Sequence, residues 1–301
     1  MNQKIIKFLD REGVVATVLL LPSLVIIFGI LLSPLVSAIY LSFTDLHLTN
    51  PNSGIFIGLK NYFAAVKDPI FWQALSRTLI FCVFTVICEV SLGLLVAFLL
   101  NRNFKGRGFV RGFIILPWAL PYVVNGIMWK WIFDANYGAL NALLTQIGII
   151  DQYQIWLGNP ATALSFVIIA NIWKETPVAI IMILSALQSF PNSLREAAEL
   201  DGANKFQTTT KIVLPFLKPI IFSLVLIKTI WALKEFDLIF IMTKGGPADG
   251  TNLLSYYIYQ NTFTYLKFGY GTALAVLLTV LTLFLAFFYK KGLGANFDVD
   301  A

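Results

Sequence analysis

The chain has 301 residues, of which 58% are hydrophobic and only 13% are charged. Soluble domains carry about a quarter charged residues, so this composition excludes an ordinary soluble globular protein and indicates that the solvent is largely lipid. A formal net charge of +6 would suggest nucleic acid in a soluble protein, but in a membrane protein basic residues gather on the cytoplasmic side.

Six segments are long and apolar enough to cross a bilayer core of about 30 Å as helices. No stretch between them is long enough to form a soluble domain with its own core. We therefore expect an all-α polytopic membrane protein with one transmembrane domain at 14–290, an N-terminal segment at 1–13 and a tail at 291–301. The six expected transmembrane helices cover residues 14–43, 74–100, 113–133, 161–190, 219–242 and 271–289.

The first apolar segment has two interpretations, a cleaved signal peptide or a membrane anchor. Lys4, Lys7 and Arg11 precede it, and Val36-Ser37-Ala38 loosely fits a cleavage site. The uncharged run at 13–44, however, far exceeds the roughly 7 to 15 apolar residues of a signal core. The sequence therefore favours an anchor.

The basic residues predict the orientation of the spans. With six spans, the N-terminus, the loops after the second and fourth spans and the C-terminus share one side of the membrane. That side holds 13 Lys and Arg residues, whereas the opposite loops hold 4. We therefore expect both termini to be cytoplasmic.

Prolines and apolar spacing add local detail. Pro117 and Pro121 in the third span and Pro177 in the fourth predict kinks, because proline removes a helical hydrogen bond.

Apolar residues at three- and four-residue spacing over 137–147 predict a short helix along the outer interface. His47 has no second His or Cys near it in sequence, which favours a solvated loop residue over a metal site.

The usual catalytic and cofactor-binding patterns are missing. The sequence contains no G-x-S-x-G, no H-E-x-x-H and no G-x-x-x-x-G-K-[ST] phosphate loop. Cys82 and Cys88 lie six apart, so they do not stack on one helical face and indicate neither a disulfide framework nor a metal site. We expect no enzymatic activity, no metal and no cofactor on this chain, so that any ATP must be bound by another chain.

The loop between the fourth and fifth spans predicts a helical hairpin at 191–218. Ser193 and Glu196 form an S-x-x-E capping box at the start of one short helix, and Gly202 suits a left-handed residue at its end. The 204–207 stretch repeats a start signal for a second short helix, and Pro215 follows it at an expected bend. From local physics alone, the hairpin is either a capped connector or a docking element for a partner.

One motif in this hairpin is specific. Glu196-Ala197-Ala198, Gly202 and Ile212-x-Leu214-Pro215 match the pattern E-A-A-x3-G-x9-I-x-L-P. The chain thereby resembles the permease subunits of binding-protein-dependent ABC importers, in which this motif forms the coupling helix that inserts into a cleft of the ATP-binding subunit. The resemblance implies an ABC importer type I permease fold and a coupling site at Glu196, Ala197, Ala198, Asp201 and Gly202.

Further stretches resemble the carbohydrate branch of that family, of the maltose-permease F or glycerol-3-phosphate permease A type. The resemblance implies a bacterial or archaeal cell-membrane protein that pairs with a second homologous permease subunit. It also implies two ATP-binding cassette subunits that hold ATP and Mg, and an external solute-binding protein. The matching stretches are Gly58-Leu59-Lys60-Asn61-Tyr62, Leu116-Pro117-Trp118, Ile172-Trp173-Lys174-x-Thr176-Pro177, Lys228 through Phe236-Asp237, and Gly245-Gly246-Pro247 with Tyr256-Tyr257-Ile258-Tyr259.

Charged residues inside the spans need partners or a watery cavity, since each costs about 2.5–3.5 kcal/mol at mid-membrane on insertion scales. Glu89 lies near the middle of the second span, where it has either a structural partner in the bundle or a role in a pathway. A sugar pathway also needs flat aromatic faces, although interfacial anchoring is the alternative interpretation of each tryptophan. Candidate pathway residues share helical faces in the third span (Asn125, Trp129), the fourth (Asn171, Lys174, Glu175) and the fifth (Lys228, Trp231, Glu235).

Two other function classes remain open at this stage. An ion-coupled secondary transporter would act without an ATPase and use Glu89, Lys174 or Glu175 as its coupling group. A membrane-embedded enzyme lacks a convincing catalytic constellation. The sequence therefore favours one half of an ATP-driven carbohydrate importer.

Overall fold

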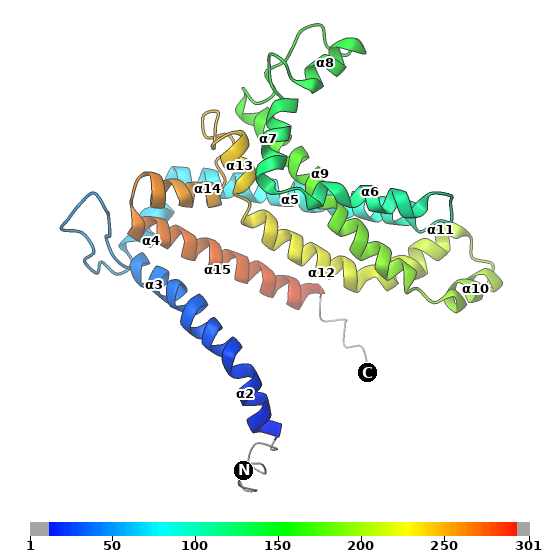
Figure 1. Ribbon diagram of the computed structural model, residues 1–301, viewed down its shortest axis with the longest axis horizontal. Helices are drawn as coiled ribbons and strands as arrows, with labels where there is room; N and C mark the ends of the chain where they lie inside the picture. Colours follow the sequence, from blue (N-terminus) through cyan, green and yellow to red (C-terminus); the bar gives the residue numbers. More distant parts are fainter. Residues whose placement is uncertain (1–11, 294–301) are drawn as a thin grey trace, which may run out of the picture. The chain divides into compact units, whose positions relative to one another are not determined.

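The computed structural model describes residues 12–293 (Figure 1). These residues divide into two compact units. Of the described residues, one unit takes in 12–67 together with 258–277, and the other takes in 68–257 together with 278–293. Lys4, Lys7 and Arg11 of the predicted N-terminal segment, and most of the predicted tail at 291–301, lie outside the described residues.

The first unit begins with a long apolar helix. It comprises α2 (Glu12–Val25), a π-helical segment η1 (Ile26–Leu31) and α3 (Leu32–Ser42), and it is followed by the short helix α4 (Lys60–Lys67). The loop between α3 and α4 is held by side chains: Asp45 accepts from two backbone N–H groups at 54–55, and Asn61 donates to the carbonyls of Ser42 and Thr44. A second π-helical segment, η3 (Gln260–Thr264), and the start of α15 (Phe268–Leu293) complete this unit.

The second unit is built on three long helices, α5 (Pro69–Leu100), α9 (Pro160–Gln188) and α12 (Leu214–Leu233). Asp68 and Asn159 cap α5 and α9 by accepting backbone N–H groups, and a proline follows each cap. Such starts are typical, because proline fits the first turn and a carboxylate or amide oxygen satisfies an orphan donor. Both helices begin within a few residues of the predicted limits.

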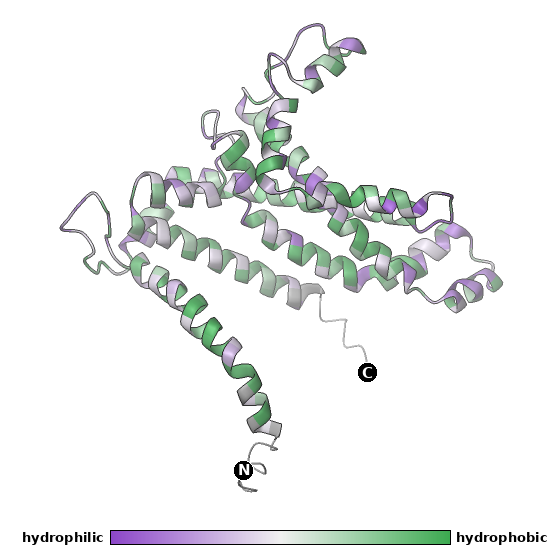
Figure 2. Cartoon of the chain, viewed as in Figure 1, coloured by the Kyte–Doolittle hydropathy of each residue, from purple (hydrophilic) through white to green (hydrophobic). Residues whose placement is uncertain are grey.

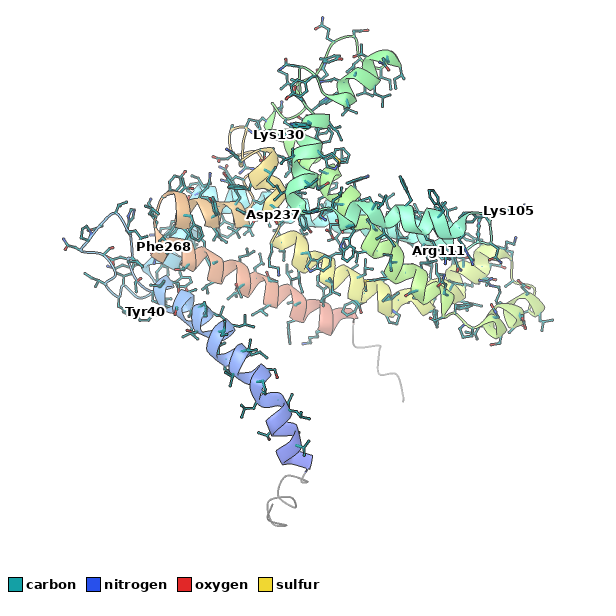
Figure 3. The ribbon with its side chains drawn as sticks, in the orientation of Figure 1. Tyr40, Lys105, Arg111, Lys130, Asp237 and Phe268 are labelled. Carbon is teal, nitrogen blue, oxygen red and sulfur yellow. The ribbon has the colours of Figure 1, made fainter. Side chains whose placement is uncertain are left out.

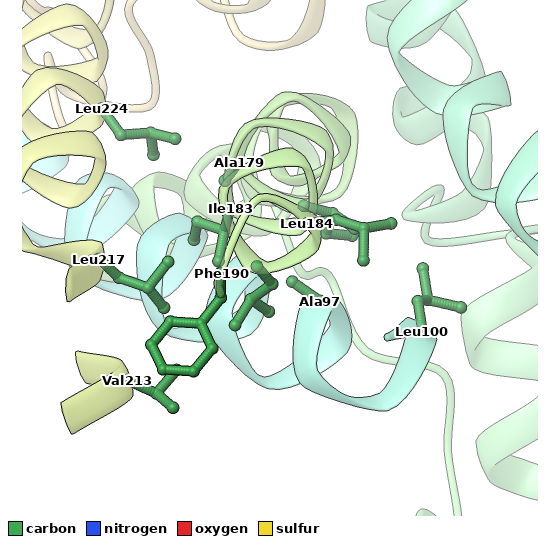
Figure 4. Packing of buried hydrophobic residues seen from close by; sticks show 11 residues of the cluster. Ala97, Leu100, Ala179, Ile183, Leu184, Phe190, Val213, Leu217 and Leu224 are labelled. Atoms are coloured by element: carbon green, nitrogen blue, oxygen red, sulfur yellow. The ribbon is translucent and has the colours of Figure 1, made fainter. Parts of the chain in front are cut away.

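The core of this unit lies where the three helices meet, around Ala97, Ile183 and Leu217 (Figure 4). Between membrane helices, packing rather than water exclusion drives association, so small residues allow close approach. Gly93 of α5 shows this, since a Cβ atom there would lie 2.6 Å from the Cβ of Ala179 on α9. The close approach of α5 and α9 at this point therefore requires glycine at position 93.

The third predicted span is broken rather than kinked. It consists of α6 (Arg107–Ala119) and α7 (Tyr122–Ile132), which meet at an angle of 94°. Leu120 is extended (φ −71°, ψ 135°) because the ring of Pro121 disfavours the helical region for the residue before it. Pro117 lies inside α6 and Pro177 inside α9, where neither ends its helix.

The fifth predicted span at 219–242 is also interrupted. α12 ends at Leu233, Lys234 is its C-cap, and the short helix α13 (Asp237–Met242) follows after Phe236. At its other end, α12 continues upstream without interruption through a π-helical segment, η2 (Thr209–Val213), into α11 (Lys205–Thr208). Pro215 follows closely on this π-helical segment and does not interrupt the helix, and the bend expected at this proline stays a prediction.

Candidate membrane spans number five in the described residues, or six when the bent pair α6–α7 counts as one span. The six agree in position with the prediction. The outer helix expected over 137–147 is α8 (Ala139–Gln146), the hairpin contributes α10 (Asn192–Leu200), and α14 (Leu254–Tyr259) precedes η3. Apolar colours dominate the long helices, whereas hydrophilic colours gather on α10 and on the loops (Figure 2).

Candidate functional site

The break between α6 and α7 is held by two neighbouring residues of α9. Lys174 Nζ donates to the carbonyl oxygens of Trp118, at 3.2 Å, and Leu120, at 2.7 Å. These carbonyls lie where α6 stops, so the ammonium group replaces the helical N–H groups that the break removes. Tyr122 Oη, at the start of α7, donates to Glu175 Oε1 at 2.7 Å. The broken helix and α9 therefore form one polar junction.

The break between α12 and α13 is likewise held by side-chain hydrogen bonds to the backbone. Glu235 Oε1 accepts the backbone N–H of Leu238 at 3.0 Å, in the first turn of α13, and Glu235 Oε2 accepts from Asn171 Nδ2 of α9 at 3.3 Å. Ser255 Oγ donates to the Glu235 carbonyl. Glu235 thus satisfies the start of α13, where a negative charge is favourable. The predicted helical face of Lys228, Trp231 and Glu235 is wrong, because the helix ends before Glu235.

A buried charge network lies beside both breaks. Lys228 Nζ of α12 is 3.2 Å from Glu89 Oε2 and 2.8 Å from Glu175 Oε2, and it donates to the Glu175 carbonyl at 2.7 Å. All three residues are buried. Buried charges are tolerated when they are paired and hydrogen-bonded. Of the two interpretations of Glu89, the geometry therefore agrees with a structural partner.

A cleft of about 530 Å³ opens at the two breaks. Trp118 and Trp231 lie on it with 47% and 42% of their surfaces exposed, so flat aromatic faces are available to a ligand. Lys228 lies 5.1 Å from the Trp231 ring centroid, in a cation–π contact. Hydrogen-bonding groups border the same cleft from Tyr122, Lys174, Glu175, Lys234, Glu235 and Asp237.

The structure separates the predicted pathway residues into two groups. Asn125 and Trp129 lie away from the cleft on α7: Asn125 is fully buried, and Trp129 packs edge-on against Trp173 with ring centroids 5.7 Å apart. Trp118 and Tyr122 line the cleft but were not predicted as pathway residues; their signal was the pair of prolines that breaks the helix between them. The residues that gather at the cleft or directly support it are Asn171, Lys174, Glu175, Lys228, Trp231 and Glu235.

The predicted hairpin is present, with one capping prediction wrong and one confirmed. α10 starts after Pro191 without a side-chain cap, so Ser193 lies within its first turn and forms no capping box. At the second helix, the Asn204 side chain accepts from the Gln207 N–H and the Gln207 side chain accepts from the Asn204 N–H, each at 2.9 Å. This is the reciprocal capping box expected at 204–207.

Gly202 ends α10 as predicted. Its φ is +79°, a left-handed conformation that residues with a Cβ rarely adopt. The N–H of Ala203 bonds to the Ala198 carbonyl at 2.9 Å and the N–H of Gly202 bonds to the Glu199 carbonyl at 3.1 Å, which is the pattern of a Schellman motif. The tight turn therefore rests on backbone bonds.

The coupling candidates differ in exposure. Glu196, Ala197, Asp201 and Gly202 are exposed, but Ala198 is only 4% exposed and packs within the chain. Of the two alanines, only Ala197 therefore presents a surface to another polypeptide. Nearby large apolar side chains are strongly exposed, at 89% for Leu200 and 75% for Phe206.

Known proteins share this architecture. The sequence profile described as "Binding-protein-dependent transport system inner membrane component" matches residues 89–291, two thirds of the chain, including the buried charges and the hairpin. The chain belongs to this family. It is thus an inner-membrane transport component, the permease subunit of an ABC transporter, and the ion-coupled alternative gains no support.

Similar proteins include two curated permeases. The sulfoquinovosyl glycerol transport system permease SmoG of Agrobacterium fabrum is 37% identical over 93% of this chain and 90% of its own length. The trehalose/maltose transport system permease MalF of Thermococcus litoralis is 33% identical over 93% of this chain and 94% of its own. Among solved structures, a chain of a bacterial ABC transporter that imports the polysaccharide alginate has a TM-score of 0.84 at 23% identity, covering 98% of this permease and 100% of that chain. That structural match agrees with the type I importer fold.

Proposed function

We propose that this permease forms half of the pathway of an ATP-driven carbohydrate importer, with the cleft at the two helix breaks as its sugar-contacting surface. The cleft carries the proposal, because two exposed tryptophans line it beside hydrogen-bonding and charged groups, at the breaks of two membrane-spanning segments. Aromatic faces suit the C–H surfaces of sugar rings, and convergent polar groups suit hydroxyls. The substrates in the names of the two relatives agree with a carbohydrate.

Partners complete the proposed importer. A second, homologous permease subunit would close the pathway, two ATP-binding cassette subunits would hold ATP and Mg, and an external solute-binding protein would deliver the sugar. A related alginate transporter has been solved with its periplasmic protein bound to an alginate pentasaccharide, which supports the last of these. Both termini would be cytoplasmic in the bacterial or archaeal cell membrane, as the basic residues predict.

The hairpin would couple the ATPase to the cleft. Glu196 and Asp201 offer exposed carboxylates, Ala197 a flat contact, and Gly202 the turn. The second arm of the hairpin continues helically through α12 to Leu233, next to the cleft. A displacement of the hairpin by a closing ATPase would therefore be transmitted along the continuous helical segment α11–η2–α12 to the α12–α13 break. The sugar contributes only its differential affinity for the outward- and inward-facing states.

Transport measurements test the proposal. The complex is reconstituted in liposomes with its binding protein, whose sugar is first found by thermal-shift screening, and ATP-dependent uptake is measured. Trp118→Ala and Trp231→Ala should each reduce uptake at least tenfold with assembly intact, whereas Trp131→Ala, an exposed tryptophan of α7 outside the cleft, should not. Unchanged uptake in both cleft variants, or ion-driven uptake by the purified chain alone, would contradict it.

A further inference from the structure

A groove between α5, α6 and α9 has a basic end and an apolar continuation. At the ends of the three helices, beside α10, a hollow of about 530 Å³ is lined by polar and basic side chains that include Arg107, Arg111 and Arg195. Along the same helices, toward the α6–α7 break, lies an apolar hollow of about 720 Å³ that includes Val96, Ile114 and Ile180.

Helical register places the lining residues of the two hollows on the same faces of α6 and α9, so we take the hollows as successive parts of one groove. On α6, Arg107 and Arg111 line the basic hollow and Ile114 and Pro117 line the apolar one, at spacings of four, three and three residues. Residues so spaced lie on one face of a helix. The same regularity holds on α9, where the lining residues recur every seven positions at Trp173, Ile180 and Leu187.

The lining of the basic hollow has a surplus of positive charge. It holds three arginines and no carboxylate among the residues that the structure describes, and none of these arginines forms an ion pair there. On α10, the carboxylate of Glu199 lines the adjoining hollow together with Arg195. Arg111 donates to the Leu100 carbonyl at 2.9 Å and, with the Gln188 amide turned so that its oxygen faces the guanidinium, to that oxygen at 2.8 and 3.0 Å. Its Nε is buried without a partner. Arg111 lies on α6 about one helical turn after its first residue, Arg107, and Lys105 lies in the turn that precedes this helix (Figure 3).

We propose that this groove binds an anionic phospholipid, with its phosphate on Arg107, Arg111 and Arg195 and an acyl chain along the apolar hollow. Guanidinium groups bind phosphate oxygens through paired N–H donors. A basic pocket between membrane helices at the cytoplasmic surface suits a lipid headgroup. The apolar continuation favours a lipid, because an acyl chain would fill it, whereas a soluble phosphate would occupy only the basic hollow. Because Arg195 belongs to α10, the headgroup would also tie the hairpin to α6. The proposal needs the membrane orientation given above but not the sugar specificity.

Lipid titration of the full chain, purified in detergent with any subunits that accompany it, tests the headgroup. Native mass spectrometry compares phosphatidylglycerol with phosphatidylcholine of the same acyl chains and with inorganic phosphate. Phosphatidylglycerol should bind at least tenfold more tightly than phosphatidylcholine. Arg107→Gln with Arg195→Gln should weaken its binding about tenfold or more, since each cation near a headgroup contributes about fivefold. Arg102→Gln with Lys105→Gln removes the same charge outside this hollow and should leave binding unchanged.

A second pair of variants tests the acyl chain. Ile114→Trp would fill the apolar hollow and should weaken phosphatidylglycerol binding, whereas Leu95→Trp, on an exposed face of α5 outside the groove, should not. Equal binding of the two phospholipids, or equal loss in the control variants, overturns the proposal. Inorganic phosphate that binds as well as the lipid and displaces it would indicate a soluble-anion site. Binding to the free chain but never to the assembled complex would indicate a protein interface, and would overturn it too.

Discussion

Among single residues, Lys228 is the one on which the buried ion pairs of the helix bundle depend. Its ammonium group pairs with both Glu89 of α5 and Glu175 of α9, so three helices share one buried cation. Lys228→Met should leave both carboxylates without their charge partner and lower the free energy of unfolding by about 3–5 kcal/mol, the usual cost of breaking a buried ion pair. The thermal unfolding midpoint in detergent measures the loss.

The matched control is Lys218→Met, an exposed lysine of the same helix, which should change the midpoint little. Adding Glu89→Gln to Lys228→Met should restore part of the loss, because one of the uncompensated charges disappears. If Lys228→Met proves as stable as Lys218→Met, Glu89 does not depend on this lysine.

At the scale of elements, the α6–α7 break depends on Lys174. Its ammonium group satisfies the carbonyls of Trp118 and Leu120, which the broken helix leaves without N–H partners. Lys174→Met should therefore let α7 move relative to α6, and distances between spin labels on the two helices should broaden. Lys130→Met, an exposed lysine on α7, is the control. Unchanged distance distributions in Lys174→Met would show that Pro121 and packing are sufficient.

The contact between α5 and α9 gives a second prediction at this scale. Gly93→Ala would place its Cβ against Ala179, so the helices must separate, and overpacking should cost about 1–3 kcal/mol. Gly112→Ala on α6 meets open space and should be neutral or slightly stabilising, because alanine favours the helix. Thermal unfolding compares the two, and equal midpoints would contradict a tight α5–α9 contact.

At the scale of the whole molecule, the proposed coupling makes ATPase assembly and uptake depend on the hairpin at 191–218. Glu196→Lys reverses an exposed charge, and Gly202→Asp imposes a side chain on a left-handed residue that ends α10. Both should impair assembly with the ATPase or uptake, while binding of sugar to the external protein stays unchanged. Co-purification of the ATPase and transport in liposomes measure the two steps. Full assembly with normal uptake in both variants would refute the coupling role of this hairpin.

The sequence by itself determined the membrane class, the six spans, the hairpin and the family, because these depend on local patterns. A run of apolar residues needs no distant partner to cross a bilayer, and the turn at Gly202 and the box at 204–207 use neighbouring groups. The E-A-A motif and its spacing identified the permease family before any contact was known. The same local reasoning erred at Ser193, where Pro191 displaced the expected cap by two residues.

Only the tertiary structure decided how the spans are broken and which polar residues meet. A proline pair indicates a kink, but a 94° break persists because Lys174 supplies hydrogen bonds 54 and 56 positions away from the carbonyls it satisfies. Helical periodicity placed Glu235 on the face of Lys228, yet the helix ends first, and Glu235, which accepts from Asn171, instead accepts the Leu238 N–H at a new helix start. Whether a helix breaks depends on how the free energy of the lost backbone hydrogen bonds compares with that of the contacts that replace them. Those contacts come from residues distant in sequence, so a local sequence pattern does not predict them.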